Sequence, residues 1–265
     1  MKRKILIFSL LLTLMLCLLG LFACGEGRGK GYGNAGSEDG GENQQEQSVD
    51  WSLIYTQENG KITGLTTYGR GLTKLTIPNE INGTTITSIG ENVFCYITAS
   101  IEWEEVSSIS TIGSYAFANY EGQSLIIPNS VTSIGGNAFN GCTATISWQE
   151  NQSIATIGDY AFYGYAGESL TIPNSVISIE ESAFMSSNLK SIVIPESVIT
   201  IKPFAFYGCE SLTSISFDDK STWYVTYSIT EWQNKNGGTL INVSDSATNL
   251  YNFTIVYECD YWYKI

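Results

Sequence analysis

The most constraining feature of this sequence is a segment that recurs at a nearly fixed interval. Residues 169–184 (SLTIPNSVISIEESAF) have near-copies on both sides, and each copy ends in an Ile-x-x-x-(Ala/Val)-Phe box. The boxes end, at steps of 23, 22, 23, 22 and 22 residues, at Phe94, Phe117, Phe139, Phe162, Phe184 and Phe206. One such unit cannot bury its own apolar face, so successive units must stack and share a core. The sequence therefore predicts a solenoid.

The length of the unit narrows the fold class. A period of 20 to 29 residues is typical of leucine-rich repeats, and each unit here contains an apolar pair with period-two spacing, such as Leu125/Ile127 or Leu170/Ile172. Alternation of this kind puts both side chains on one face of a strand. We expect a mostly β leucine-rich-repeat solenoid of about six coils of 22–23 residues, with short parallel strands, a structural Phe inside each coil, and a cap at each end.

A second period of 45 residues is superimposed on the first. It relates Trp103 to Trp148 and Tyr120 to Tyr165, and it also relates Pro128 to Pro173. The coils are therefore of two kinds. A Pro-type coil carries Ile-Pro directly after its strand, and a Trp-type coil carries Trp at the second apolar position and is two residues longer before its Phe box. The duplicated unit was a pair of coils.

The first 23 residues have the composition of a signal peptide. Lys2, Arg3 and Lys4 precede an apolar run, and the segment ends before Cys24. Leu21, Ala23 and Cys24 resemble a bacterial lipoprotein lipobox, which implies cleavage before Cys24 and lipidation of that residue. The alternatives are an uncleaved anchor or an ordinary secretory signal with an incidental cysteine. In each case the chain leaves the cytoplasm.

Four further segments follow the signal peptide. Residues 24–48 hold the lipidated cysteine and a Gly-rich stretch that is too polar to fold, which predicts a flexible tether. Residues 49–71 predict an N-terminal cap with a hairpin at Asn59-Gly60. The repeats occupy residues 72–217. Residues 218–265 have no repeat and are rich in aromatic residues, which predicts a C-terminal cap or, alternatively, an aromatic platform for carbohydrate or peptide.

Charge excludes one class of partner. Removal of residues 1–23 leaves 10 basic against 26 acidic side chains, a net charge of about −16. Nucleic-acid binding needs a basic stripe that neutralises phosphates. We therefore expect no nucleic acid among the partners.

The six cysteines do not form an obvious disulfide framework. Apart from Cys17 in the signal peptide and Cys24, they are Cys95, Cys142, Cys209 and Cys259. Cys142 and Cys209 share a repeat position three coils apart, which places them roughly 14 Å apart at the strand spacing. That separation exceeds the Cα limit of about 7 Å for a disulfide. We interpret them as buried small residues, and a bridge between Cys209 and Cys259 stays open.

The sequence offers little catalytic chemistry. It has no histidine, which removes Ser-His-Asp and Cys-His arrangements and His-ligated metals. Neighbouring acids such as Glu104-Glu105 and Glu180-Glu181 point to opposite sides of an extended chain and are interpreted as solvated turn charges. We expect no enzyme, no catalytic residue, no metal site and no cofactor.

A binding surface is the remaining kind of site. Solenoids align side chains of one repeat position on an extended face. The candidate ligand-binding residues are therefore Trp103, Trp148, Glu105, Glu150, Tyr120 and Tyr165. For the tryptophans the alternative is an inward, structural position, because they replace the second apolar residue of the strand. The tyrosines, three residues after a box Phe, are the better surface candidates.

The repeat resembles a known family. Leu-x-Ile-Pro-x-x-Val-x-x-Ile-x-x-x-Ala-Phe-x-x-Cys, at residues 125–142 and less completely at 192–209, is similar to the BspA-type leucine-rich repeats of bacterial surface proteins. The resemblance covers residues 72–217. Polar Glu180 and Lys202 in place of the box glycine depart from the pattern. The resemblance implies a surface-exposed adhesive protein, but it identifies no binding residue.

These observations predict a lipid-anchored protein of the bacterial cell envelope, exposed at the surface and without catalytic activity. Its expected partner is another protein, from host extracellular material or from bacterial surfaces, and its expected membrane contact is the lipid on Cys24. Two alternatives remain at this point. One is a structural or assembly component of the envelope, and the other is a carbohydrate-binding surface protein.

Overall fold

The computed structural model describes residues 49–105, 107–218, 222–227, 233–235, 237–244, 249 and 260–264. The expectations for the signal peptide, for Cys24, for the tether and for Cys259 lie outside these residues. Within the described ranges, no helix has both the length and the apolar character needed to cross a membrane.

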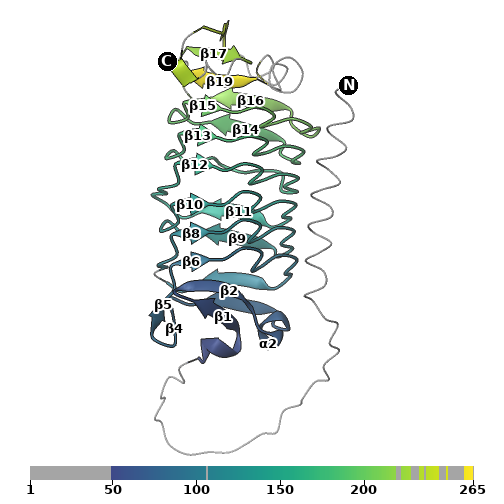
Figure 1. Cartoon of the computed structure of the whole chain (residues 1–265). Helices are drawn as coiled ribbons and strands as arrows, with labels where there is room; N and C mark the ends of the chain where they lie inside the picture. The colour runs from purple at the N-terminus through teal and green to yellow at the C-terminus, as the bar shows by residue number, and fades with distance from the viewer. Residues whose placement is uncertain are drawn as a thin grey trace, which may run out of the picture. The chain divides into compact units, whose positions relative to one another are not determined.

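The repeats form coils stacked on one another, as predicted (Figure 1). Each coil contributes a four-residue strand position to what we call the first face. Its members are β3 (Lys74–Ile77), β7 (Ser100–Trp103), β9 (Ser124–Ile127), β11 (Thr145–Trp148), the extended residues 169–172, β14 (Ser191–Ile194) and β16 (Ser214–Phe217). The solenoid therefore has about seven turns, one more than the Phe boxes alone indicate. In β9, Leu125 and Ile127 are buried and Ser124 and Ile126 are exposed, which is the expected alternation.

A second face consists of two-residue strands that precede the Phe boxes. They are β6 (Ser88–Ile89), β8 (Thr111–Ile112), β10 (Ser133–Ile134), β12 (Thr156–Ile157), β13 (Ser178–Ile179) and β15 (Thr200–Ile201). Figure 1 shows these strands one above another along one side of the stack. Their pairing is parallel and in register, but it is interrupted between β10 and β12, so two sheets form instead of one.

The six box phenylalanines form one continuous column inside the stack. Neighbouring rings have centroid separations of 5.0 to 5.5 Å and lie within 18° of parallel. All six side chains are buried. Two left-handed residues bracket each phenylalanine, for example Asn137 (φ 59°) and Gly141 (φ 63°) around Phe139. These left-handed turns direct each ring into the interior, which confirms the predicted structural role of the box.

Pairing on the first face follows the presence of an N–H group after the strand. Three pairs form: β3 with β7, β9 with β11, and β14 with β16. In each pair the residue after the later strand donates to the carbonyl of the coil before it. These bonds are Glu104 N to Ile77 O (3.1 Å), Gln149 N to Ile127 O (3.0 Å) and Asp218 N to Ile194 O (3.0 Å).

The three other junctions of the first face are unpaired. There the later strand position is followed by Pro128, Pro173 or Pro195, and proline has no N–H to donate. We call the junction between β7 and β9 the Trp103 break, and the junction between β11 and residues 169–172 the Trp148 break. Residues 169–172 form no backbone–backbone hydrogen bond with the rest of the described chain, because a Pro-type coil follows them as well.

The N-terminal cap contains the predicted hairpin. β1 (Tyr55–Glu58) and β2 (Lys61–Leu65) pair antiparallel around Asn59-Gly60, and β2 pairs in parallel with β6. A 3-10 helix η2 (Trp51–Leu53) and a short helix α2 (Thr67–Arg70) flank the hairpin. The first coil is widened by a second hairpin of β4 (Glu80–Ile81) and β5 (Thr84–Thr85), as the Asn82-Gly83 insertion predicts. The cap covers the first end of the core.

The C-terminal segment closes the other end of the stack (Figure 1). β17 (Trp223–Thr226) pairs antiparallel with β18 (Thr239–Ile241) and with β19 (Tyr261–Lys264), and β19 pairs antiparallel with β15. Trp223 and Trp262 are fully buried. The aromatic residues in the described part of this segment therefore include core residues of a cap.

Candidate binding surface

A tryptophan side chain bridges each of the two Trp breaks. Trp103 Nε1 donates to Ile126 O at 2.6 Å, and Trp148 Nε1 donates to Thr171 O at 2.7 Å. Both indoles are partly buried against the core. The bonds replace backbone bonds that the following Pro-type coil does not make. Both tryptophans therefore have a structural role between coils while part of each side chain stays accessible.

A tyrosine hydroxyl occupies the same breaks from the inside. The Tyr120 hydroxyl donates to Ala99 O at 3.0 Å and also bonds the backbone of Ile101. The Tyr165 hydroxyl accepts from Ile146 N at 3.1 Å. These backbone groups would otherwise be buried without a partner, which costs about 1–3 kcal/mol each. The prediction that Tyr120 and Tyr165 lie at the surface is wrong, because both are fully buried to satisfy the open strand edge.

Two glycines in the sequence are a signal for this arrangement, and the surface prediction took no account of them. Gly122 and Gly167 each follow a tyrosine by two residues, and a Cβ atom on either glycine would lie 2.0 or 2.2 Å from the tyrosine hydroxyl oxygen. No other residue fits beneath the phenol. The motif Tyr-x-Gly in place of the Cys found in Pro-type coils therefore indicates a tyrosine that turns inward.

The buried hydroxyls and thiol of this column stay protonated at neutral pH. Burial raises the pKa of Tyr120 to about 12, and a hydrogen bond with Ile101 opposes the shift. Burial likewise raises the pKa of Tyr165, against a hydrogen bond with Ile146. The thiol of Cys142 has a pKa raised by burial to about 12. Cys142 and Cys209 are both buried and are not bonded to each other, as their spacing predicts.

A surface cleft opens at the Trp148 break. Its volume is about 800 Å³, which lies in the range of small-ligand sites. One wall is β11 with the residues that follow it, and the other is the extended segment 169–175. Trp148 lines the cleft together with side chains that are mainly Ser, Thr, Asn and Gln. We call this feature the Trp148 cleft.

The remaining candidate residues lie near these breaks in different ways. Glu105 and Glu150 are exposed, and Glu150 does not belong to the lining of the Trp148 cleft. Glu104, by contrast, accepts a hydrogen bond from Asn79 N at 2.7 Å, and Gln149 accepts the equivalent bond from Asn129 N at 3.0 Å. Of the six predicted ligand-binding residues, Trp148 is the one that the structure places in the cleft.

Two exposed isoleucines lie side by side on the second face. Ile177 is 47% exposed and Ile199 is 36% exposed, and Ile199 N donates to Ile177 O at 2.8 Å, so the residues are in adjacent coils. The equivalent residue of an earlier coil is the exposed Thr132. These isoleucines are not among the predicted binding residues, although a branched apolar residue at an outward strand position is a usable signal.

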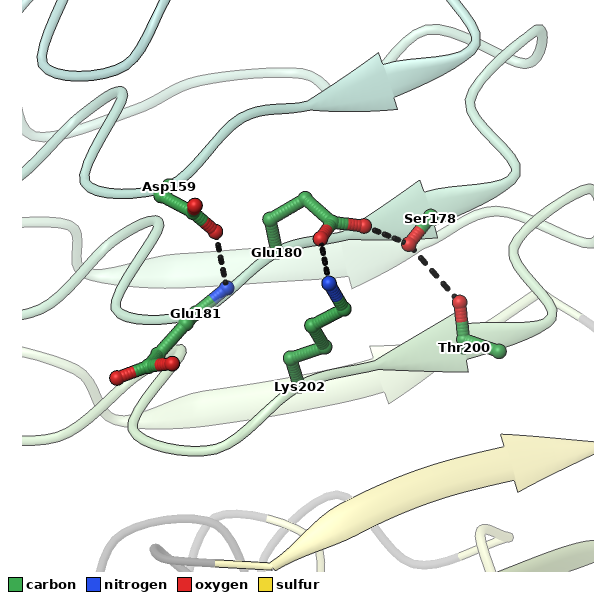
Figure 2. Close-up of polar contacts among 6 residues, drawn as sticks. All are labelled: Asp159, Ser178, Glu180, Glu181, Thr200 and Lys202. Atoms are coloured by element: carbon green, nitrogen blue, oxygen red, sulfur yellow. Dashed lines mark hydrogen bonds and ion pairs between the residues drawn. The ribbon is translucent and has the colours of Figure 1, made fainter. Parts of the chain in front are cut away.

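Polar residues replace the box glycines in the last two complete coils (Figure 2). Glu180 forms an ion pair with Lys202 and accepts from the Ser178 hydroxyl, to which Thr200 Oγ1 donates at 2.9 Å. Partial burial lowers the pKa of Lys202, but the bond and charge of Glu180 outweigh it and raise the pKa overall. Glu180 is therefore not the fully solvated turn charge that we predicted. It links adjacent coils.

The polar groups of the described residues include no candidate metal centre. No cluster of three or more Cys, Asp or Glu side chains is arranged there to hold an ion. The arrangement of the described residues offers hydrogen-bonding and apolar surface to a partner.

Comparison with protein families identifies the repeat. The family described as BspA type leucine rich repeat region matches residues 66–185 and 155–236, with six copies. The chain belongs to the BspA-type leucine-rich repeat family. The match extends a few residues into both caps, which agrees with the β2–β6 and β15–β19 pairing that joins each cap to this BspA-type stack.

Solved structures with similarity to this BspA-type chain are also bacterial leucine-rich repeat proteins. A leucine rich cell surface protein from Faecalibacterium prausnitzii is 22% identical over 73% of this chain and 59% of its own, with a TM-score of 0.49. A leucine rich repeat protein from T. pallidum is 24% identical over 64% of this chain and 71% of its own, with a TM-score of 0.40. The chain thus spans about three fifths of the length of the first. A search of curated proteins finds no match.

Proposed function

We propose that this chain is a non-enzymatic protein of the bacterial cell surface that binds other proteins, held to the membrane by lipid on Cys24. Family membership supports a repeat protein of the bacterial surface. The lipobox-like sequence before Cys24 supports the anchor. The expected partners are host extracellular proteins or proteins on other bacterial cells.

The exposed pair Ile177 and Ile199 is the observation that carries protein binding. Both side chains point outward from regular strands and gain nothing from the core of their own chain. Adjacent apolar side chains on a polar surface favour contact with an apolar area of a partner. The flat, repeated backbone beneath them keeps the pair in place, so little entropy is lost on binding.

Surface location is tested by adding protease to intact cells that express the full chain. The proposal predicts cleavage without lysis. Protection of the chain until the cells are lysed would contradict it and would favour an internal envelope component.

Protein binding is tested by adhesion of the same cells to surfaces coated with extracellular-matrix or plasma proteins. We expect the double substitution Ile177→Glu and Ile199→Glu to lower adhesion by at least about tenfold, a loss of about 1.4 kcal/mol. Thr132→Glu is the matched control, since it adds an acid at the equivalent position of an earlier coil and should leave adhesion unchanged. Equal adhesion by all three proteins would overturn the proposal.

A further inference from the structure

We propose that the Trp148 cleft is a binding site for a neutral saccharide. This inference does not depend on protein binding at Ile177 and Ile199, which lie on the second face and do not line the cleft.

The lining of the cleft has no Lys, Arg, Asp or Glu side chain, although the chain as a whole has a net charge of −13. Its polar side chains include Ser147, Gln149, Asn151, Thr171 and Asn174. Hydroxyl and amide groups both donate and accept hydrogen bonds, as the hydroxyl groups of a sugar do. An anionic ligand would find no counter-charge in the cleft and would be repelled by the acidic surface around it. The lining therefore matches an uncharged, hydroxyl-rich ligand.

Trp148 supplies a fixed apolar part of the wall. Its Nε1 bond to Thr171 O and its edge-on contact with Phe162, at a centroid distance of 6.4 Å and 73°, hold the indole in one orientation. The C–H side of a sugar ring is apolar and packs well on a rigid aromatic surface. Because the indole is already held in the free protein, little side-chain entropy is lost when a ligand binds.

The shape of the cleft favours a compact ligand over a peptide strand. The two coils are hydrogen-bonded directly at both ends of the break, through Ala166 N to Cys142 O (3.0 Å) and Ile177 N to Ala155 O (2.8 Å). An extended peptide that added to β11 would run along the strand into one of these closed ends. A short oligosaccharide fits between them.

Backbone groups add hydrogen-bonding capacity to the second wall. Residues 169–172 are unpaired with the described strands on both sides. By the register of the paired coils, in which Thr145 N donates to Gln123 O, the N–H groups of Ser169 and Thr171 face β11. These donors are available to ligand hydroxyl groups in the mouth of the cleft.

The Trp103 break is an internal control for this proposal. It has the same tryptophan bridge and the same buried tyrosine, but Glu102 and Glu104 occupy the positions of Ser147 and Gln149. Glu104 and Gln149 accept the same backbone hydrogen bond. The substitutions Ser147→Glu and Gln149→Glu therefore introduce charge while keeping the structural bond.

The test uses the full chain, purified in detergent, on an array of neutral and acidic oligosaccharides. The neutral arms carry host-type glycans without sialic acid and fragments of plant or bacterial polysaccharides, which distinguishes the two sources. The acidic arms carry sialylated and sulfated sugars. We expect binding on a neutral arm. Calorimetric titration with that oligosaccharide should then show at least a tenfold loss of affinity for the Ser147→Glu/Gln149→Glu variant.

Three further variants make the test decisive. Glu102→Ser/Glu104→Gln, at the other break, and Ile177→Glu should keep the wild-type affinity. Asn174→Ala removes one exposed amide without touching the core and should weaken binding several-fold, which provides a readout if the double acidic variant unfolds. Absence of binding on every neutral arm, equal binding of acidic sugars, or unchanged affinity in both cleft variants would overturn the proposal.

Discussion

The Trp103 break and the Trp148 break use one internal device beneath two different surfaces. In both, a proline removes a ladder donor, an indole crosses the gap to a carbonyl of the next coil, and a tyrosine hydroxyl bonds the open strand edge. Outside, the first break presents acidic side chains and the second presents Ser147 and Gln149. The comparison shows that packing restricts the inside of a duplicated coil pair, while its outward positions are free to take different chemistry.

The largest effect should come from the phenylalanine column, and it should be equal at the two breaks. Phe117 and Phe162 each stack on two neighbouring rings and meet a tyrosine edge-on. Phe117→Ala and Phe162→Ala should each lower the free energy of unfolding by about 3–5 kcal/mol, because each leaves a cavity in a dry core. Urea denaturation measures the change. A large loss for only one variant would show that the breaks are not equivalent inside.

An intermediate effect should separate the two tyrosines. Tyr120→Phe and Tyr165→Phe should each cost about 1–3 kcal/mol, because buried backbone groups lose their partner. The cost should be greater for Tyr120, whose hydroxyl bonds the backbone at both Ala99 and Ile101. Thermal unfolding measures both variants. Tyr163→Phe, at a partly exposed position of the same coil, is the control and should stay within about 0.5 kcal/mol; a cost equal to that of Tyr165→Phe would contradict the proposed role of the hydroxyl.

The smallest effect concerns the surface charge that distinguishes the breaks. Lys74 and Glu102 form an ion pair of 2.8 Å on the first face, and both side chains are more than half exposed. Solvent and salt screen such a pair, so Glu102→Gln should cost about 0.2–1 kcal/mol. The difference from wild type should vanish at about 1 M NaCl, where the Debye length is about 3 Å. A salt-independent loss would mean that Glu102 supports the fold by packing.

Much of the fold could be predicted because it follows from local pattern. The recurring Phe gave the coil period, alternation in Leu125/Ile127 gave the strand faces, and Asn59-Gly60 gave the cap hairpin. The structure also confirms that Cys142 and Cys209 do not bond to each other. Each of these depends on residues within one coil or on simple multiplication of the coil spacing.

The candidate site was harder to predict because side-chain direction in a turn depends on the neighbouring coil. Tyr120 and Tyr165 follow a box Phe in a turn, where an aromatic residue is usually accessible. They are buried because the coil before them leaves backbone groups unpaired. The position of Gly122 and Gly167 contained this information, but its meaning depends on knowing where the tyrosine ring lies.

The sequence by itself determined the repeat, the two coil types and the places where proline removes a backbone donor, because these depend on residue type and spacing. Only the tertiary structure decided how the missing bonds are replaced and which side chains reach solvent. An unpaired N–H or carbonyl is satisfied by whichever group in an adjacent coil comes within about 3 Å, and adjacency in a solenoid links residues some twenty positions apart in the chain. Trp148, predicted either inside or outside, lies at that boundary, bonded to the next coil and lining a cleft.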